Sequence, residues 1–166
     1  MRQKGFTLIE LLVALAVGSV LLTGAVLTIH QVVWGTGRNS SQVVALTDVN
    51  QAALSIKRDL MMTQHTDLPD GVPQSSVWLG WTDYTSFETG NQTHSSAYAL
   101  SGTELLRTYD GTESVAGRNI TSVTFTKDAQ DGRIINVVIT GTGSGIQQRS
   151  ETLEFRVYLR TEEVSE

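Results

Sequence analysis

The stretch LIELLVALAVGSVLLTGAVLTI (8–29) contains one ionisable side chain, that of Glu10, in an otherwise apolar run. Beyond Glu10 the run has only three polar side chains, those of Ser19, Thr23 and Thr28. As an α-helix, residues 11–29 would extend about 28 Å, close to the roughly 30 Å hydrocarbon core of a bilayer. The sequence therefore predicts a helix that spans a membrane.

Two basic residues, Arg2 and Lys4, precede this run. By the positive-inside rule they place the N-terminus in the cytoplasm, so the chain after about residue 35 is expected outside the cytoplasmic (inner) membrane. A secretory signal peptide would have a shorter apolar region of about 7–15 residues, followed by a small-residue cleavage site. The triplet Ala14-Leu15-Ala16 lies within the run, so we predict a single-pass anchor.

Length and composition limit what lies beyond the anchor. The chain has 166 residues, no cysteine and a net charge of −5. One domain plus an accessory element fits this length. The outer domain must fold without disulfides, and the acidic balance argues against nucleic acid as a partner.

A second helical pattern follows the anchor. Five apolar residues recur at steps of three and four, which places them on one stripe: Leu46, Val49, Ala53, Ile56 and Leu60. The charged residues Asp48, Lys57 and Asp59 fall largely off that stripe. We predict an amphipathic helix over about residues 42–63, which the prolines of HTDLPDGVP (65–73) prevent from continuing. Gly35 and Gly37 are positions where the helix could be interrupted or bent.

From about residue 77 the pattern becomes that of β-strands, with β-branched and aromatic residues between turn residues. The predicted strands are 77–84, 97–100, 104–109, 122–127, 135–141 and 153–160. Hairpin turns are expected at Ser101-Gly102 and Asp131-Gly132, and 83–96 as a variable surface loop. The predicted fold class is α+β: a long N-terminal helix, membrane-spanning in its first half and amphipathic in its second, packed on an antiparallel β-sheet head.

Glu10 needs an explanation of its own. A carboxylate at the centre of a bilayer costs about 2.5–3.5 kcal/mol on insertion scales, and less near the interface, so a partner is expected. An alternative is that Glu10 is an interfacial carboxylate near a helix start, where the helix dipole favours it without further purpose. Electrostatics alone leaves both interpretations open.

The stretch GFTLIELLVALAV (5–17), preceded by Arg2 and Lys4, resembles the N-terminal signature of the type IV pilin superfamily. The resemblance implies that a prepilin peptidase cuts between Gly5 and Phe6 on the cytoplasmic side, and that the new Phe6 amine is methylated. It also implies that Glu10 pairs with the Phe6 amine of a neighbouring subunit in a filament. The implied organisation is a leader (1–5), a transmembrane and filament-core helix (6–34) and an extracytoplasmic head (35–166).

The rest of the chain resembles minor pilins of the PilW type and pseudopilins of the J type in the order of four segments: RDL (58–60), AYALSGTELLRTYDG (97–111), SVTFTK (122–127) and LEFRVYLR (153–160). Leu27 stands where many major pilins have proline, and the paired C-terminal cysteines of many pilins are absent, which suits a minor subunit.

The implied function is to prime the tip of a type IV pilus or type II secretion pseudopilus. The implied partners are other pilin or pseudopilin subunits, the prepilin peptidase/methyltransferase and an assembly platform in the membrane. The alternative function is a membrane-anchored extracytoplasmic binding protein that does not polymerise.

Other candidate sites are weak. His30, His65 and His94 are far apart in the sequence, which indicates surface histidines rather than a zinc site. Asp128 and Asp131 favour a hairpin loop over a calcium site. The run GTGSG (141–145) is typical of a turn, since it lacks the lysine of a phosphate-binding loop. Without a catalytic constellation, we predict neither an enzyme nor a cofactor.

The three tryptophans each carry a prediction. Trp78 and Trp81 are three residues apart in a predicted strand, so they face opposite sides and one of them is expected to be exposed. A satellite core cluster is the favoured interpretation of this pair, and an exposed anchor for a partner is the alternative. Trp34, at the end of the apolar run, is expected at the membrane interface.

Overall fold

The computed structural model describes residues 7–83, 91–144 and 148–160, and within this range the side chains of 36–39 are not described. It contains one helix and eight strands in these parts of the chain. The elements are α1 (Leu8–Met62), β1 (His65–Thr66), β2 (Ser76–Asp83), β3 (Gln92–Ser101), β4 (Glu104–Tyr109), β5 (Thr112–Gly117), β6 (Ile120–Lys127), β7 (Ile134–Thr142) and β8 (Ser150–Tyr158). The predicted α+β class is confirmed.

The chain divides into two compact units, residues 1–39 and residues 40–166, and α1 contributes residues to both. The second unit, called the head below, contains all the strands of the described residues. Helix α1 continues through Gly35 and Gly37, so the predicted interruption is wrong. A glycine within a helix costs only about 1 kcal/mol relative to alanine, so two glycines do not by themselves end a helix of this length.

The first part of α1 is apolar on every side. Among the described residues, α1 is the only helix long and apolar enough to cross a membrane, and none of its most apolar window is buried. Its three hydroxyl side chains donate to carbonyl oxygens of the preceding turn: Ser19 to Ala16, Thr23 to Ser19 and Thr28 to Gly24, at 2.8–2.9 Å. Such bonds satisfy hydroxyl donors that a bilayer core cannot solvate.

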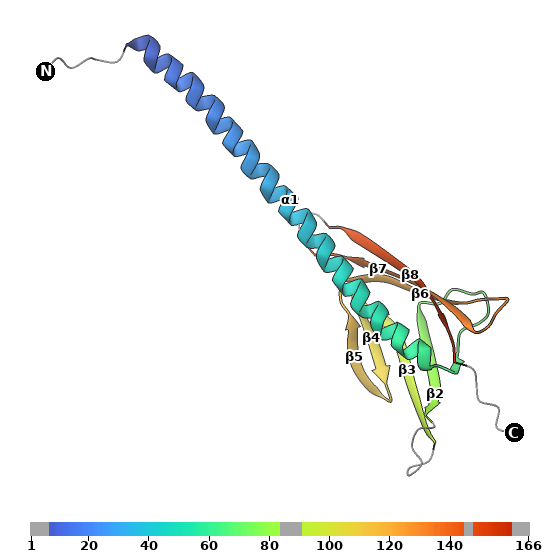
Figure 1. The fold of residues 1–166 in the computed structure, drawn as a ribbon. Coiled ribbons are helices and arrows are strands. Elements are labelled where there is room, and N and C mark those ends of the chain that lie inside the picture. The colour runs from blue at the N-terminus through green and yellow to red at the C-terminus, as the bar shows by residue number, and fades with distance from the viewer. Residues whose placement is uncertain (1–6, 84–90, 145–147, 161–166) are drawn as a thin grey trace. The chain divides into compact units, whose positions relative to one another are not determined.

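The strands are antiparallel, as predicted, and they form two sheets rather than one. The five-stranded sheet has the order β1-β2-β3-β4-β5 and the three-stranded sheet the order β6-β7-β8. The segment between β1 and β2 joins them, because Gln74 pairs with Phe125 and Asp70 with Lys127 of β6. Figure 1 shows the second part of α1, coloured cyan to green, lying across these strands.

The second part of α1 is buried along a stripe wider than predicted. Val49, Ala53, Ile56 and Leu60 are buried as expected, and Ala45 and Ala52 join them. Leu46 is 42% exposed, so its assignment to the stripe is wrong. Inward-facing apolar residues of both sheets complete the core, among them Leu79, Tyr98, Leu105, Phe125, Ile135, Val137 and Ile139.

The hairpin turns follow local backbone chemistry. The β3–β4 hairpin turn lies one residue later than predicted: Ser101 ends β3 and pairs with Glu104, so Gly102, at a φ of 61°, and Thr103 form the turn. The next hairpin joins β4 to β5 through Asp110 and Gly111, whose φ values are 45° and 82°. Two central residues with positive φ define a type I′ turn, in which Asp-Gly is strongly favoured. We did not predict β5, although this dipeptide signals it.

Three sequence boundaries need correction or qualification. Residues 92–96, predicted as loop, belong to β3, and residues 84–90 of that loop lie outside the described residues. Gly141 and Thr142 belong to β7 rather than to a turn. The predicted turn at Asp131-Gly132 does join β6 to β7.

The loop after β7 approaches α1 so closely that only glycine fits. A Cβ added at Gly143 would collide with the carbonyl oxygen of Ser41 and lie 2.7 Å from the Ser41 Oγ. We expect Gly143→Ala to lower the free energy of unfolding of the head by about 1–3 kcal/mol, measured by chemical denaturation of the full chain in micelles. The matched control is Gly132→Ala, where the added Cβ meets the flexible Lys127 side chain at 3.2 Å. Equal stability of the two variants would contradict this prediction.

Candidate functional site

The only acidic side chain in the apolar part of α1 lies at the helix start, where it closes a capping box. The backbone nitrogen of Thr7 donates to Glu10 Oε2 at 2.9 Å, and the Thr7 hydroxyl donates to the same oxygen at 2.8 Å. The Glu10 nitrogen in turn donates to Thr7 Oγ1 at 3.4 Å. These reciprocal bonds satisfy two of the four amide groups that a helix start leaves unpaired.

This local role of Glu10 was missed in the sequence. A threonine followed three residues later by glutamate, directly before an apolar run, is the sequence pattern of a capping box. In Thr7-Leu8-Ile9-Glu10 the pattern is complete. The contacts with Thr7 support the interpretation that Glu10 acts at the helix start. Pairing of Glu10 with a neighbouring subunit stays a prediction.

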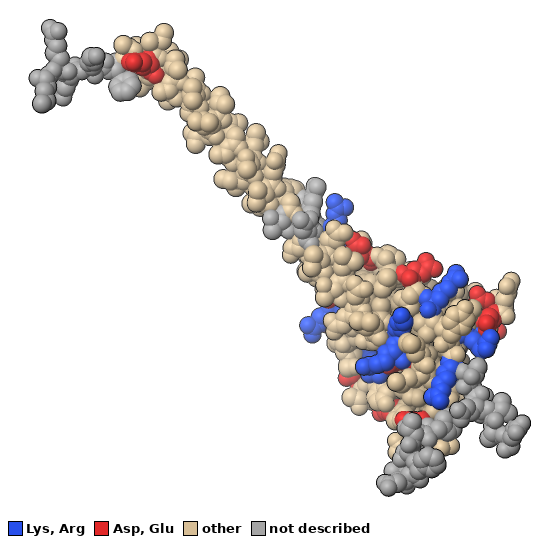
Figure 2. All heavy atoms as spheres, in the orientation of Figure 1, with Lys and Arg blue, Asp and Glu red and all other residues tan. Residues whose placement is uncertain are grey.

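The surface beside Glu10 is an open apolar hollow. It is lined by Ile9, Glu10, Val13, Ala14 and Val17. Figure 2 shows this part of α1 as uncharged apart from one acidic group near its beginning. Ionisable residues in membrane segments generally pair with another polar group or face a water-filled cavity. Gly5 and Phe6, the predicted cleavage and methylation residues, lie outside the described residues.

In the head, a second carboxylate from α1 is buried and fully engaged. The Asp59 side chain is 2% exposed. Its Oδ2 accepts hydrogen bonds from Ser96 Oγ (2.7 Å), Tyr98 OH (2.7 Å) and Arg107 Nε (2.6 Å), and its Oδ1 accepts one from Arg107 Nη2 (3.0 Å). These contacts, called the Asp59 network below, join α1 to β3 and β4. They correct the prediction that Asp59 lies off the packed side of the helix.

The Asp59 network changes the ionisation of its members. Burial alone would raise the pKa of Asp59, but the hydrogen bonds from Arg107, Tyr98 and Ser96 outweigh burial, and the pKa lies below its ordinary value. Burial and the bond to Asp59 raise the pKa of Tyr98. The hydrogen bond to Asp59 also raises the pKa of Arg107. The network therefore contains an ionised Asp–Arg pair at neutral pH.

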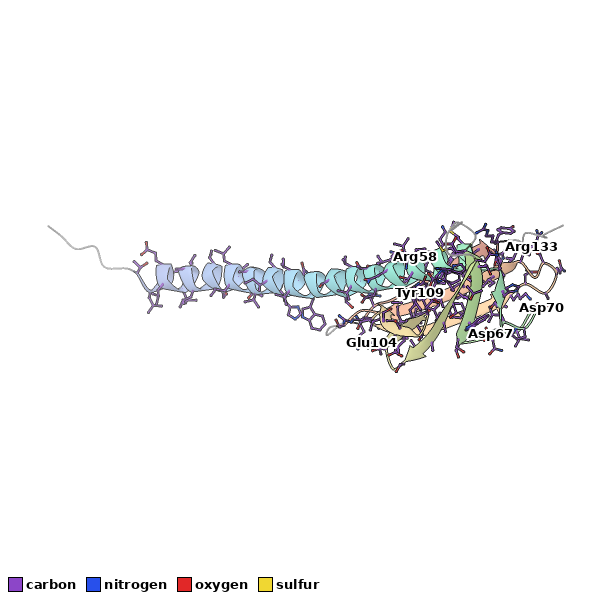
Figure 3. All side chains as sticks on the ribbon, turned by 90° about the horizontal axis from the view of Figure 1, so that it is seen from below. Arg58, Asp67, Asp70, Glu104, Tyr109 and Arg133 are labelled. Atoms are coloured by element: carbon purple, nitrogen blue, oxygen red, sulfur yellow. The ribbon has the colours of Figure 1, made fainter. Side chains whose placement is uncertain are left out.

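An aromatic cluster continues from this network. The rings of Trp81, His94 and Tyr109 lie 5.9–6.0 Å apart, centroid to centroid. The Arg107 guanidinium carbon lies 4.6 Å from the centre of the Tyr109 ring, a cation–π distance. Figure 3 labels Tyr109 on the sheet and Arg58 on α1. The cluster fastens the end of β2 to β3 and β4.

Asp110 holds the imidazole of His94 in place. The Nδ1 atom of His94 lies 2.6 Å from Asp110 Oδ2, and the Ser95 nitrogen donates to Asp110 Oδ1 at 2.7 Å. The bond from His94, followed by that from Ser95, lowers the pKa of Asp110. Both partners come from β3, so Asp110 also ties the β4–β5 turn to that strand.

The tryptophan predictions agree with the structure in part. Trp78 is 44% exposed and Trp81 is 7% exposed, so the two rings do face opposite sides of β2. Trp81 belongs to the aromatic cluster, as the satellite-cluster interpretation requires. Trp34 is 48% exposed and stacks on His30 at 5.3 Å. Its place at a membrane interface stays a prediction.

The weak candidate sites are explained by local contacts. Asp128 Oδ1 accepts bonds from the nitrogens of Gln130 and Asp131, and Asp131 bonds Arg133, which confirms the hairpin-loop interpretation. His30, His65 and His94 are not brought together as a metal site: in the part of the chain that the structure describes, no group of three or more His, Cys, Asp or Glu residues is placed to hold a metal ion.

Comparison with known proteins finds a family match for the N-terminal region. The family model for the prokaryotic N-terminal methylation motif matches residues 1–26. No curated protein matches the chain at a significant level. The match covers Glu10 and the first part of α1 and does not extend into the head.

Proposed function

The chain carries the type IV pilin signature at residues 1–26, and from this premise we propose that it is the precursor of a minor pilin or pseudopilin subunit. The proposed function is assembly rather than catalysis. The observation that carries it is the methylation motif itself, which coincides with the start of a membrane-length apolar helix bearing one carboxylate. The single-pass helix supports a membrane-anchored pilin.

The proposed maturation removes the leader. A prepilin peptidase cuts between Gly5 and Phe6, and the methyltransferase activity modifies the Phe6 amine. Glycine before the cut has no side chain to obstruct a peptidase cleft. The apolar helix that starts at Leu8 keeps the bond near the bilayer surface. Arg2 and Lys4 support a cytoplasmic location for this step.

The proposed assembly step uses Glu10 and the hollow beside it. In the membrane monomer, the capping box satisfies Oε2 of Glu10. In a filament, the Phe6 amine of a neighbouring subunit supplies a positive charge to the same carboxylate, while that subunit's helix covers the apolar hollow. An ion pair of this kind removes the cost of a lone charge in an apolar core.

The head supplies specificity in this proposal. The predicted extracytoplasmic part of the chain, residues 35–166, faces outward from the membrane. Its head contacts neighbouring heads at the tip of a type IV pilus or type II secretion pseudopilus, which the subunit helps to prime. The resemblance to PilW-type and J-type subunits in residues 58–160 supports this position. The proposed partners are other pilin or pseudopilin subunits and the membrane assembly platform.

Processing gives the direct test. When the protein is co-expressed with a prepilin peptidase, we expect the intact mass to fall by residues 1–5 and to rise by one methyl group. Gly5→Ala is expected to leave the chain uncut, because the added methyl group obstructs the peptidase cleft. Mass spectrometry of the membrane fraction measures both results.

Glu10→Ala serves as the matched control, since it lies beyond the cut site and should still lose the leader. A native chain that keeps residues 1–5 in the presence of an active peptidase would contradict the proposal. The protein would then be a membrane-anchored binding protein that does not polymerise.

A further inference from the structure

The five-stranded sheet has an outer face that α1 does not cover. On β3 the side chains of Ser96 and Tyr98 reach Asp59 of α1, so this face of the strand points inward. Alternate residues of a strand point to opposite faces. Ser95 and Ala97 therefore point outward, together with their partners across β2, Gly80 and Trp78.

Trp78 is the one large aromatic side chain that the described part of this face exposes. A Cβ added at Gly80 would lie 2.6 Å from Cη2, 3.0 Å from Cζ3 and 3.3 Å from Cζ2 of Trp78. The six-membered ring thus occupies the space above Gly80 and leaves the indole 44% exposed. Asp67, labelled in Figure 3, accepts a 2.8 Å hydrogen bond from the backbone nitrogen of Trp78 and so fixes the strand at this position.

A hollow of about 330 Å³ lies beside this ring. Its lining includes Trp78, Gly80, His65, Thr82, Thr93 and Ser95. The strand register agrees, because His65 and Ser95 are the two partners of Gly80, and Thr93 is the partner of Thr82. We call it the outer-face pocket.

The chemistry of the outer-face pocket selects a class of ligand. Its described lining residues include no Asp, Glu, Lys or Arg, although the whole chain has 29 such residues by the counts of 12 basic and 17 acidic. Ligand charge is therefore not what these residues recognise. They offer an aromatic surface with a negative π-face, surrounded by three hydroxyl groups and an imidazole that donate and accept hydrogen bonds.

A sugar ring matches these groups. The C–H hydrogens on one face of a pyranose carry partial positive charge and stack on an aromatic ring, while its hydroxyl groups point sideways to hydrogen-bonding side chains. We propose that the outer-face pocket binds an uncharged oligosaccharide, with one pyranose ring stacked on Trp78. A protein partner would instead favour a larger continuous apolar patch, whereas the pocket beside Trp78 is lined by Gly80 and by the polar side chains of Thr82, Thr93 and Ser95.

The aromatic cluster packs against the outer-face pocket and stabilises its conformation. Trp81 and His94 reach the edge of the pocket from the other side of β2 and β3. His94 is fixed by Asp110 at 2.6 Å and Trp81 by its ring contacts. A preformed site loses less conformational entropy when it binds. This binding function does not depend on filament assembly.

The test uses the full chain in micelles of a phosphocholine detergent, which has no sugar headgroup. Cellotetraose, chitotetraose and maltotetraose are each titrated, and saturation transfer from protein to sugar C–H protons is measured by NMR. We expect at least one of the three to give saturable transfer in the millimolar range. We expect Trp78→Ala to reduce it at least tenfold, and Val115→Ala, an exposed change elsewhere on the sheet, to leave it unchanged.

Gly80→Ala provides a second variant that keeps the tryptophan. The added methyl group displaces the end of the Trp78 ring, which is a flexible neighbour, so the fold is retained and transfer is expected to fall. If circular dichroism shows that Trp78→Ala does not fold, the result for Gly80→Ala decides whether the pocket binds the sugar. The proposal is overturned by absence of saturable transfer from all three sugars, by full transfer in the variants, or by binding of tetragalacturonate alone, which would indicate recognition of charge.

Discussion

Glu10→Ala is expected to lower the amount of this protein in sheared filaments at least a hundredfold relative to the membrane fraction. In the proposed filament the change leaves the Phe6 amine of a neighbour buried without its counter-charge. Breaking a buried ion pair costs about 3–5 kcal/mol, and each 1.4 kcal/mol is about a tenfold change in an equilibrium constant. The measurement is quantitative immunoblotting of both fractions in cells that express the remaining filament subunits.

The capping box requires a control, because Glu10→Ala also removes the bond to the Thr7 nitrogen. Glu10→Gln retains that bond, since glutamine also closes a capping box, but it has no charge. We expect Glu10→Gln to be excluded from filaments nearly as strongly as Glu10→Ala. Thr7→Val removes both contacts of the hydroxyl, to Glu10 Oε2 and from the Glu10 nitrogen, but keeps the charge of Glu10. It is expected to have a much smaller effect. Normal incorporation of Glu10→Gln would show that Glu10 acts as a helix cap and not as a charge.

Asp59→Ala is expected to lower the free energy of unfolding of the head by about 3–5 kcal/mol, because it leaves a buried charge without its partner. Arg107, 16% exposed, loses two hydrogen bonds, and the Ser96 and Tyr98 hydroxyls lose their acceptor. For a domain of this size we expect a fall in melting temperature of roughly 10–20 °C. Thermal unfolding of the full chain in micelles, followed by tryptophan fluorescence, measures it.

Lys57→Ala is the matched control on the same helix. Lys57 is exposed, so we expect the free energy of unfolding of Lys57→Ala to lie within about 0.5 kcal/mol of that of the native chain. Replacing the pair with apolar residues, Asp59→Leu with Arg107→Met, should recover much of the loss, as a buried pair is often replaceable in this way. A loss below 1 kcal/mol in Asp59→Ala would contradict the stabilising role of the network.

The same network predicts how the stability depends on pH. The pKa of Asp59 is lower in the folded chain than in the unfolded chain. A group of this kind binds more protons when unfolded, so it stabilises the fold above its unfolded pKa of about 3.9. That contribution is lost as the pH falls through the folded pKa. The stability difference between the native chain and Asp59→Ala should therefore shrink below about pH 4.

Much of the architecture could be predicted because it depends on neighbours in the sequence. The apolar run 8–29 required a membrane-length helix, and period-two alternation with Ser101-Gly102 required the β3–β4 hairpin. Local signals were also overlooked. The capping box of Thr7 and Glu10, and the Asp110-Gly111 turn that produces β5, could both have been found from the sequence alone.

The sequence by itself determined the parts of this protein whose chemistry lies within a few residues: the pilin signature, the helix start at Leu8 and the strand content of the head. Tertiary structure alone decided which polar groups are buried and which apolar ones are exposed. Asp59 can be buried because its hydrogen bonds offset the cost of removing it from water. They come from Ser96, Tyr98 and Arg107, which lie 37 to 48 residues further along the chain. Trp78 is exposed because only small residues pair with it across the outer face. Such pairings depend on strand register and helix rotation, which a one-dimensional pattern does not specify.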